Sequence, residues 1–520
     1  MAGLRAASLA AVVLLAMTGP LTAQDVTLRS HDGTVEIDGD LLGYDGEFYR
    51  VDTAYGELTV DGSGVTCEGP GCPDLQAFVA RLVASGAPSI GRVLMPALLE
   101  AFAIRDDYHL KRHDAGPDLL HFTLHPAQSP ETVLGDFQFR LTNSSEGFAD
   151  LLANEADIAM TLREARPEER ARAREAGLGD LTLPGRLRVL ALDALIPVVA
   201  PANPVQGLSL RQLRGVLSGE IAGWADLGGV DAPIDLHLWA ADTGIGQASL
   251  DQVLAMDART VPGRTTWHRD GRSLADAVLA NPFALGLTTR SDQGATWEVS
   301  LIGACGFALR AHRRTVKTED YPLTAPLFLY LPARRMPKLV RDFLAYLRDP
   351  SAQLVIRRAG FVDQLPEEIE INAQGDRFAN AIAQAGPEIG LDELQRMVSL
   401  LAPLKRLTTT FRFETGSTRL DAQSRSNVEQ LAAALELGLY DNRRLVFVGF
   451  SDGQGPAAGN RQIALRRAEA VRAAVTRAAE TARLERIDLA VDAFGEAMPM
   501  ACDDTDWGRQ VNRRVEVWVR

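Results

Sequence analysis

The sequence lacks several features that would each point to a class of protein. Lysine and arginine number 54 against 68 aspartates and glutamates, a net charge of −14, which argues against the clustered positive charge that nucleic-acid binding requires. No stretch beyond the N-terminus stays apolar for about 20 residues, so a multi-pass membrane protein is excluded. What is present, 46% hydrophobic residues in 520, suffices for about three folded domains.

The first two dozen residues have the pattern of an export signal. Arg5 supplies the basic start, residues 6–17 are apolar, and small residues up to Ala23 form a cleavage site. We therefore expect a removed signal peptide over residues 1–23, with an uncleaved membrane anchor as the alternative. No cysteine follows the cleavage site, which excludes a lipoprotein.

The sequence has only four cysteines, and their positions indicate which disulfides could form in an oxidising compartment. Cys67 and Cys72 flank a Gly-Pro-Gly turn and are predicted to form a disulfide that closes a short loop. Cys305 and Cys502 fall in segments that we assign to different domains. Free thiols and an interdomain bridge both stay open for this second pair.

Along the chain, the pattern of apolar residues changes four times. Residues 24–74 alternate short β-type runs with turn signals and predict a small β module. Residues 75–363 alternate helical stretches with buried strands, which is typical of an α/β domain. Residues 364–405 suit a linker plus a helix, and residues 406–520 have a βαβαβ order that predicts a compact α/β sandwich.

Several motifs of the middle segment together resemble periplasmic solute-binding proteins of the phosphate-binding type. They are SGAPSIG at residues 85–91, NSSEGF at residues 143–148, ADIAMTLRE, and the long block NPVQGLSLRQLRGVLSGEIAGWADLGG over residues 203–229. The resemblance implies two lobes that close on a ligand, lobe one over about 79–190 and 283–363 and lobe two between. It also implies a small anion as ligand and leaves open an ABC transporter as partner.

An oxyanion stripped of water needs several donors, mostly amides and hydroxyls at helix N-termini, with one arginine. The resemblance places such donors at these positions: Ser89, Ser144, Ser145, Arg163, Thr243 and Gly244. The family's motif ends in a hydroxyl where this chain has Ile245. That departure leaves another oxyanion or a small organic acid open beside phosphate.

The last segment resembles the OmpA-like peptidoglycan-binding domain through VGFSDGQG, GNRQIALRRAEAVRAAV, FGEAMP and GRQVNRRVEVWV. The resemblance implies that Asp452 holds the amino group of diaminopimelate and that Arg467, fifteen positions on, holds its carboxylate. One carboxylate and one guanidinium suit a zwitterion. The resemblance adds Asn460 beside them and Arg513 at the groove edge, whereas Phe450, Ser451 and Ala464 depart from the family pattern.

Two signals of enzyme or metal chemistry are discounted. Residues 449–453 satisfy G-x-S-x-G, the nucleophile elbow of α/β-hydrolases, but such an enzyme needs a later histidine and the last one is His312. The histidine pairs at 109/113 and 121/125 have ligand spacing but no accompanying glutamate, so no metal and no cofactor are expected.

The sequence thus predicts an exported, non-enzymatic binding protein in the periplasm, associated with peptidoglycan and the outer membrane. Its two-lobed domain captures a small oxyanion and its last domain binds diaminopimelate. The alternative is an envelope adaptor whose solute-binding domain has lost its ligand, and a third hypothesis is an envelope enzyme using Ser451.

Overall fold

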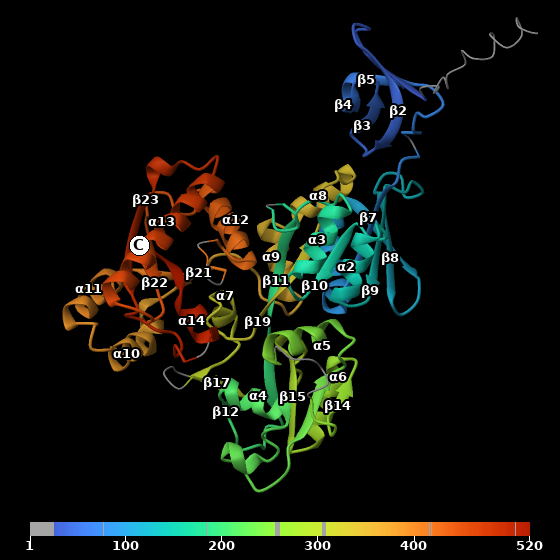
Figure 1. The fold of residues 1–520 in the computed structure, drawn as a ribbon. Coiled ribbons are helices and arrows are strands. Elements are labelled where there is room, and N and C mark those ends of the chain that lie inside the picture. The colour runs from blue at the N-terminus through green and yellow to red at the C-terminus, as the bar shows by residue number, and fades with distance from the viewer. Residues whose placement is uncertain are drawn as a thin grey trace, which may run out of the picture.

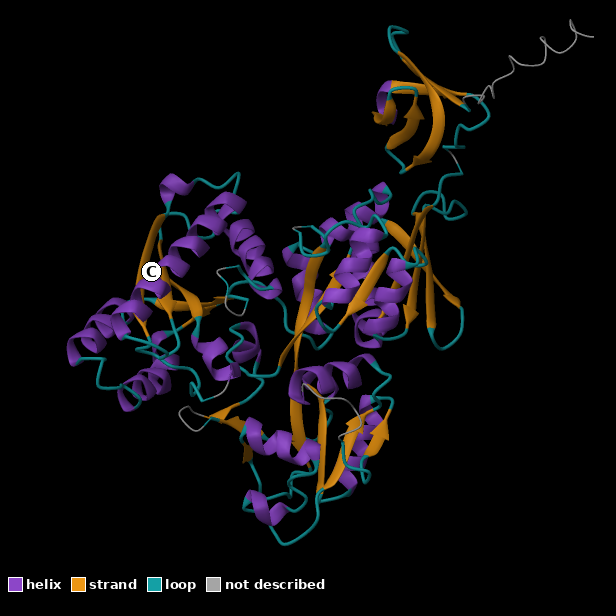
Figure 2. Ribbon diagram, in the orientation of Figure 1, coloured by secondary structure: helices purple, strands orange, loops and turns teal. Residues whose placement is uncertain are grey.

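The computed structural model describes residues 25–75, 77–183, 185–254, 261–303, 308–414, 417, 419–504 and 506–520. The predicted signal peptide lies outside these residues. The N-terminal part consists mainly of strands, whereas the rest mixes helices and strands (Figure 2). Within the described residues no helix is both long and apolar enough to cross a bilayer.

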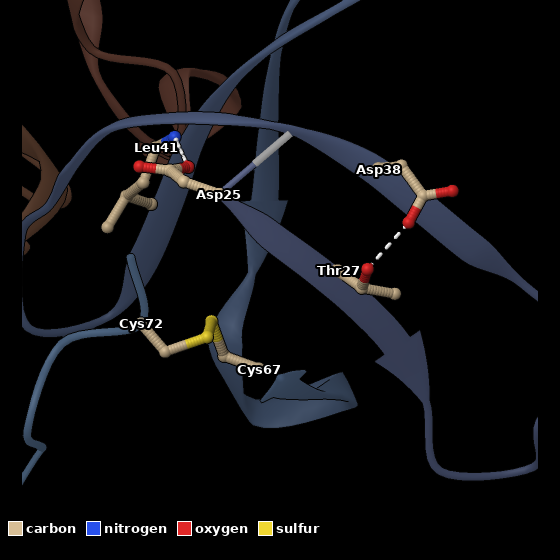
Figure 3. The surroundings of a disulfide bond; sticks show 6 residues. All are labelled: Asp25, Thr27, Asp38, Leu41, Cys67 and Cys72. Atoms are coloured by element: carbon tan, nitrogen blue, oxygen red, sulfur yellow. Dashed lines mark hydrogen bonds between the residues drawn. A yellow bond between two sulfur atoms is a disulfide. The ribbon is translucent and has the colours of Figure 1, made fainter. Parts of the chain in front are cut away.

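The N-terminal part is a five-stranded antiparallel sheet of order β4-β3-β2-β1-β5. Its small core contains Val26, Leu28, Tyr49 and Val51. The predicted disulfide is present: Cys67 in β5 is bonded to Cys72 just beyond the strand (Figure 3). The strands are β1 (Val26–Ser30), β2 (Glu36–Tyr44), β3 (Phe48–Thr53), β4 (Gly56–Asp61) and β5 (Val65–Glu68).

Two lobes follow, joined by a strand that belongs to both (Figure 1). β11 (Leu187–Val199) pairs antiparallel with β19 (Thr324–Tyr330) through its first half and with β15 (Ala284–Thr289) through its second half. Eleven of its thirteen residues are buried, which explains its nearly continuous apolar run. The strand order of this large sheet is β14-β13-β15-β11-β19-β10-β6-β9-β8-β7.

Lobe one contains the strands from β6 to β10 and the helices that cover them. These elements are β6 (Ala80–Gly86), a π-helical turn (Ser89–Leu94), α1 (Met95–Arg105), β7 (Tyr108–Asp114), β8 (Leu119–Pro126), β9 (Gly135–Leu141), α2 (Ser144–Leu152), β10 (Ile158–Thr161), α3 (Pro167–Glu175), α8 (Lys338–Tyr346) and α9 (Pro350–Arg358).

Lobe two contains the remaining strands of the large sheet and a three-stranded sheet of order β12-β17-β18. Its elements are β12 (Gly207–Leu208), α4 (Leu210–Ser218), β13 (Asp235–Trp239), α5 (Gly244–Ser249), β14 (Thr266–His268), α6 (Gly271–Ala280), β15, β16 (Trp297–Glu298), β17 (Ser300–Ile302) and β18 (Ala308–Leu309). α7 (Arg313–Lys317) leads back toward lobe one.

One expected lobe boundary is wrong. The sequence placed the return to lobe one at residue 283, but β15 pairs parallel with β13 and stays in lobe two. The chain returns through α7 and β19 instead. A fully buried strand such as β15 fits the core of either lobe, so its apolar run could not reveal which sheet it joins.

The C-terminal part is a five-stranded sheet of order β20-β21-β24-β22-β23 with helices on both faces. α12 and α13 share one core with the sheet; α10 and α11, from the segment predicted as a linker plus a helix, share a second. The elements are β20 (Glu368–Ile369), α10 (Gly375–Ala383), α11 (Leu391–Leu401), β21 (Lys405–Arg412), α12 (Ala422–Glu436), β22 (Arg444–Phe450), α13 (Ala457–Ala478), β23 (Asp488–Gly495), α14 (Asp506–Asn512) and β24 (Arg514–Val519).

This part is docked against the segment between α7 and β19. Arg406 on β21 is fully buried and donates to both carboxylate oxygens of Asp320, at 2.7 and 3.1 Å. Arg412 donates to the backbone oxygens of Thr318 and Glu319 at 3.3 and 2.6 Å. The predicted fold class is therefore confirmed, with the added finding that the last domain packs beside the crossover strands.

Candidate functional site

A cavity of about 450 Å³ lies between the two lobes and is lined by residues of both. Ser89, at the start of the turn after β6, comes from lobe one. Thr243, Gly244 and Ile245, at the start of α5, come from lobe two. The cavity is thus formed where a two-lobed protein closes on its ligand.

Local backbone geometry explains why the chain can build this cavity. Gly86 ends β6 at φ +141, and a Cβ there would lie 1.9 Å from the Met160 oxygen, so only glycine fits. Thr243 caps α5 by accepting from the Gly246 N–H at 3.0 Å. A Cβ on Gly244 would lie 3.1 Å from the Ala87 Cβ, so glycine also lets the lobes approach closely.

Several donors of this cavity have no partner among the described residues. The Ser89 Oγ is buried and makes no hydrogen bond. The backbone N–H groups of Ser89, Gly244 and Ile245 also find no acceptor there. A buried donor left unpaired costs about 1–3 kcal/mol, and an acceptor from outside the protein would remove that cost for Ser89 Oγ.

The charged residues of the cavity are mixed. Arg269 donates to Asp242 at 2.6 Å, so that guanidinium is partly neutralised. Burial raises the pKa of Asp292, whereas the Ser273 N–H chiefly lowers that of Asp270. The full charged lining is Arg92, Asp118, Asp242, Arg269, Asp270 and Asp292. Because carboxylates outnumber guanidiniums, neutral hydroxyl and N–H donors must carry most of the binding of an anion.

Three of the six predicted anion ligands lie outside this cavity. Ser144 is buried and accepts from the Leu162 N–H at 3.1 Å. Arg163 donates to both carboxylate oxygens of Glu169, at 2.8 and 2.7 Å, and to Ser145 Oγ at 3.2 Å. Its charge is therefore balanced by a carboxylate six residues on, although its Nε is buried without a hydrogen-bond partner in the described residues.

The lobes touch each other beside the cavity. Asn143 Nδ2 donates to the Asp242 oxygen at 3.1 Å, and Arg166 Nη2 donates to Asp251 at 3.0 Å. Ser145 Oγ, from lobe one, donates to Gln247 Oε1 in lobe two at 3.4 Å. The structure thus represents a closed arrangement of the two lobes.

In the last domain, three predicted residues come together beside β22 and α13. Arg513 Nη1 donates to Asp452 Oδ2 at 2.5 Å. The Arg467 guanidinium lies over the Phe413 ring, 5.2 Å from its centroid, and its Nε is buried without a partner. Burial lowers the pKa of Arg467, Arg513 adds to that effect, and Asp452 opposes it.

The fourth predicted residue, Asn460, is hydrogen-bonded to a neighbouring carboxylate. Asn460 is buried and donates to Glu496 Oε2 at 2.7 Å, and to the Gly455 oxygen at 3.3 Å. Burial raises the pKa of Glu496, and the Asn460 hydrogen bond opposes that rise. Asn460 therefore holds a carboxylate and the loop before α13, while Asp452, Arg467 and Arg513 form the charged cluster.

Sequence reasoning missed four residues of these sites: Arg92, Arg269, Phe413 and Glu496. Arg269 lies between β14 and the start of α6, the same strand-to-helix position that singled out the other donors, so this signal was available. Glu496 sits in the motif FGEAMP, which was noted without a role for this side chain, and Phe413 directly follows β21.

No metal site accompanies these clusters in the described part of the chain, where no group of three or more histidine, cysteine or acidic residues could hold an ion. Cys502 is disulfide-bonded, which excludes a free thiol at that position. Cys305 lies outside the described residues.

Comparison with known families identifies both parts. The model described as "PBP superfamily domain" matches residues 80–350, more than half of the chain, and the model of the OmpA family matches residues 412–513. The two resemblances expected from the motifs are thus confirmed at the level of these families.

Among solved structures, an ABC-type phosphate transport receptor from Vibrio cholerae is 22% identical at a TM-score of 0.42, covering 54% of this chain and 99% of its own. A putative phosphate ABC transporter substrate-binding protein from Clostridium perfringens, solved with bound phosphate, is 19% identical at 0.41, covering 54% and 99%. No curated protein matches the chain.

Proposed function

The chain belongs to the PBP superfamily through residues 80–350, and we propose that it is an exported, non-enzymatic solute-binding protein held at the cell wall. In this proposal the two lobes capture a small oxyanion such as phosphate. The OmpA family domain binds diaminopimelate of peptidoglycan and keeps the protein in the periplasm. We also propose the limits 24–74, 75–363, 364–405 and 406–520 for its parts, with residues 364–405 packed on the sheet of the last part.

One observation carries both halves of the proposal. Each domain keeps a buried donor unpaired at the place where a ligand would meet it, Ser89 Oγ in the lobes and Arg467 Nε in the last domain. A native protein retains few such groups, because each one weakens the folded state. A bound oxyanion would satisfy the first and a carboxylate the second.

The charged cluster of the last domain suits a zwitterion. Asp452 offers a carboxylate to an ammonium group, and Arg467 offers a guanidinium whose Nε no protein acceptor occupies. Arg513 holds Asp452 in place through a hydrogen bond of 2.5 Å. The ammonium of diaminopimelate would meet Asp452 while the neighbouring carboxylate meets Arg467.

The test of the wall-binding half uses the full mature chain and purified peptidoglycan sacculi. Arg467→Gln should weaken sedimentation with sacculi by roughly 10- to 100-fold, the value of one charge-assisted hydrogen bond of about 1.5–3 kcal/mol. Arg466→Gln, the exposed neighbour on α13, is the matched control and should bind as wild type. Equal binding by both variants would show that Arg467 is not the carboxylate ligand.

The test of the ligand half is calorimetric titration of the full mature chain with phosphate, sulfate and small carboxylates. Ser89→Ala should lower the affinity for the bound anion by roughly 3- to 10-fold, as expected for one neutral hydrogen bond. Ser129→Ala is the control, because Ser129 is exposed and its hydroxyl makes no hydrogen bond.

A second function, an envelope adaptor without a ligand, is favoured by the arrangement of Arg163. Glu169 neutralises this arginine, and the lobes are already in contact through Asn143 and Arg166. Under this alternative no solute gives saturable heat, while sedimentation with sacculi stays intact. The calorimetric titration and the sedimentation with sacculi together therefore distinguish the receptor from the adaptor.

A further inference from the structure

A second cavity, of about 240 Å³, lies where lobe one meets the OmpA family domain. β11, β19 and the turn between α8 and α9 form one wall, and α12 and α13 form the other. Its lining is largely apolar and includes Leu187, Leu329, Leu347, Val428 and Ala474. None of these residues belongs to the two sites described above.

One guanidinium in this largely apolar lining has no carboxylate hydrogen-bonded to it within the described residues. Arg188, on β11, donates through Nη1 to the Leu344 oxygen at 2.5 Å, but its Nε is buried and has no partner. The carboxylate at the rim, Glu429, is paired with Arg348 at 2.9 Å. Burial lowers the pKa of Arg188 to about 10, Arg348 acts in the same direction, and Glu429 opposes them.

A desolvated guanidinium with no carboxylate bonded to it destabilises the folded protein, and an anion that enters the same space reduces that penalty. Most of the rest of the lining is apolar, and its other polar members are Arg348, Arg425, Ser426, Glu429 and Gln430. An anion that suits this space therefore carries its charge at one end and an apolar body behind it. At ~30 Å³ per water-sized group the cavity holds about eight such groups. Six carbons and two carboxylate oxygens match that number.

We propose that this interdomain cavity binds a short straight-chain carboxylate of about six carbons, with the carboxylate on Arg188 and the chain between Leu329 and Val428. The ligand contacts both domains at once, so its binding also strengthens their docking. This site is independent of the oxyanion cavity between the lobes and of the peptidoglycan site.

The experiment is calorimetric titration of the full mature chain with hexanoate as the probe. Butanoate and decanoate test the length, and 1-hexanol and hexylamine test the charge. Hexanoate should give saturable heat and bind at least tenfold more tightly than each of the other four. Equal binding of hexanol and hexanoate would overturn the role of Arg188, and the absence of heat with hexanoate would overturn the site.

Three variants locate the binding. Arg188→Met removes the charge at similar volume, and Ala474→Leu fills the cavity without touching the charge, so each should lower hexanoate affinity at least tenfold. Arg172→Met, on the exposed face of α3, should leave it unchanged. If Arg188→Met does not fold, Ala474→Leu decides alone, and undiminished binding by that variant would refute the proposal. Sedimentation with sacculi should be unaffected in all three variants.

Discussion

Glu319 lies at the contact between the crossover segment and the OmpA family domain, and we expect it to make stability depend on pH. Its backbone adopts a left-handed φ of +54, and its backbone oxygen accepts a hydrogen bond from Arg412 at 2.6 Å. The side chain is 12% exposed, and its Oε1 has no partner. Burial raises the pKa of Glu319 from 4.5 to about 8, with Asp421 adding and Arg412 opposing.

The sign of the effect follows from which state holds the proton. Between pH 4.5 and pH 8 the unfolded chain has lost the Glu319 proton, whereas the folded protein keeps it. Stability from this group is therefore complete below pH 4.5 and is lost as the pH rises through about 8. At about 1.36 kcal/mol per pH unit, the loss between pH 5 and pH 8 amounts to roughly 3–4 kcal/mol.

The variant Glu319→Gln keeps the shape and removes the titration. Between pH 5 and pH 8 the free energy of unfolding of wild type should fall by roughly 3–4 kcal/mol more than that of Glu319→Gln. Urea titration followed by tryptophan fluorescence measures both. Glu480→Gln, at an exposed position, should follow the wild-type curve. Parallel curves for wild type and Glu319→Gln would refute the reasoning, because they would show that the carboxyl is ionised in the folded protein.

Two further predictions concern backbone packing and the disulfide. A Cβ on Gly449 would lie 2.1 Å from the Ala464 oxygen, so Gly449→Ala should destabilise the OmpA family domain by about 1–3 kcal/mol. Gly459 in α13 has open space around it, so Gly459→Ala should stabilise the same domain by about 0.5–1 kcal/mol. Thermal unfolding of the two variants compares these effects. Replacing Cys67 and Cys72 by serine removes a cross-link over five positions and should cost the N-terminal sheet about 2 kcal/mol, measured by urea titration of the full chain under oxidising conditions.

Elements with a strong local signal were predictable from the sequence. The run RLVFVGF is β22 at its full length, because five of its seven residues are apolar and β-favouring and turn signals bound the run on both sides. Asp452 and Arg467, fifteen positions apart, lie close enough for Asp452 to raise the pKa of Arg467. Such features depend on segments that are close in sequence.

The partners of charged residues were not predictable in the same way. Arg163 occupies the expected position after β10, yet the first turn of α3 brings Glu169 to it and neutralises it. A local motif determines the position of the arginine on the backbone. Which carboxylate pairs with its guanidinium depends on how the following helix packs. For the same reason the sequence could not separate Ser89 and Thr243, which share a cavity, from Ser144, which does not.

The docking of the OmpA family domain shows this limit most clearly, because it depends on a pair of residues 86 positions apart. Arg406 and Asp320 are both almost fully buried, and breaking such a pair leaves an uncompensated charge at a cost of about 3–5 kcal/mol. Asp320 precedes Tyr321, whose hydroxyl donates to the Leu195 oxygen at 3.0 Å, where β11 passes from one lobe to the other. The OmpA family domain is therefore attached at the crossover between the lobes, so any change in lobe closure has to be accommodated next to this domain.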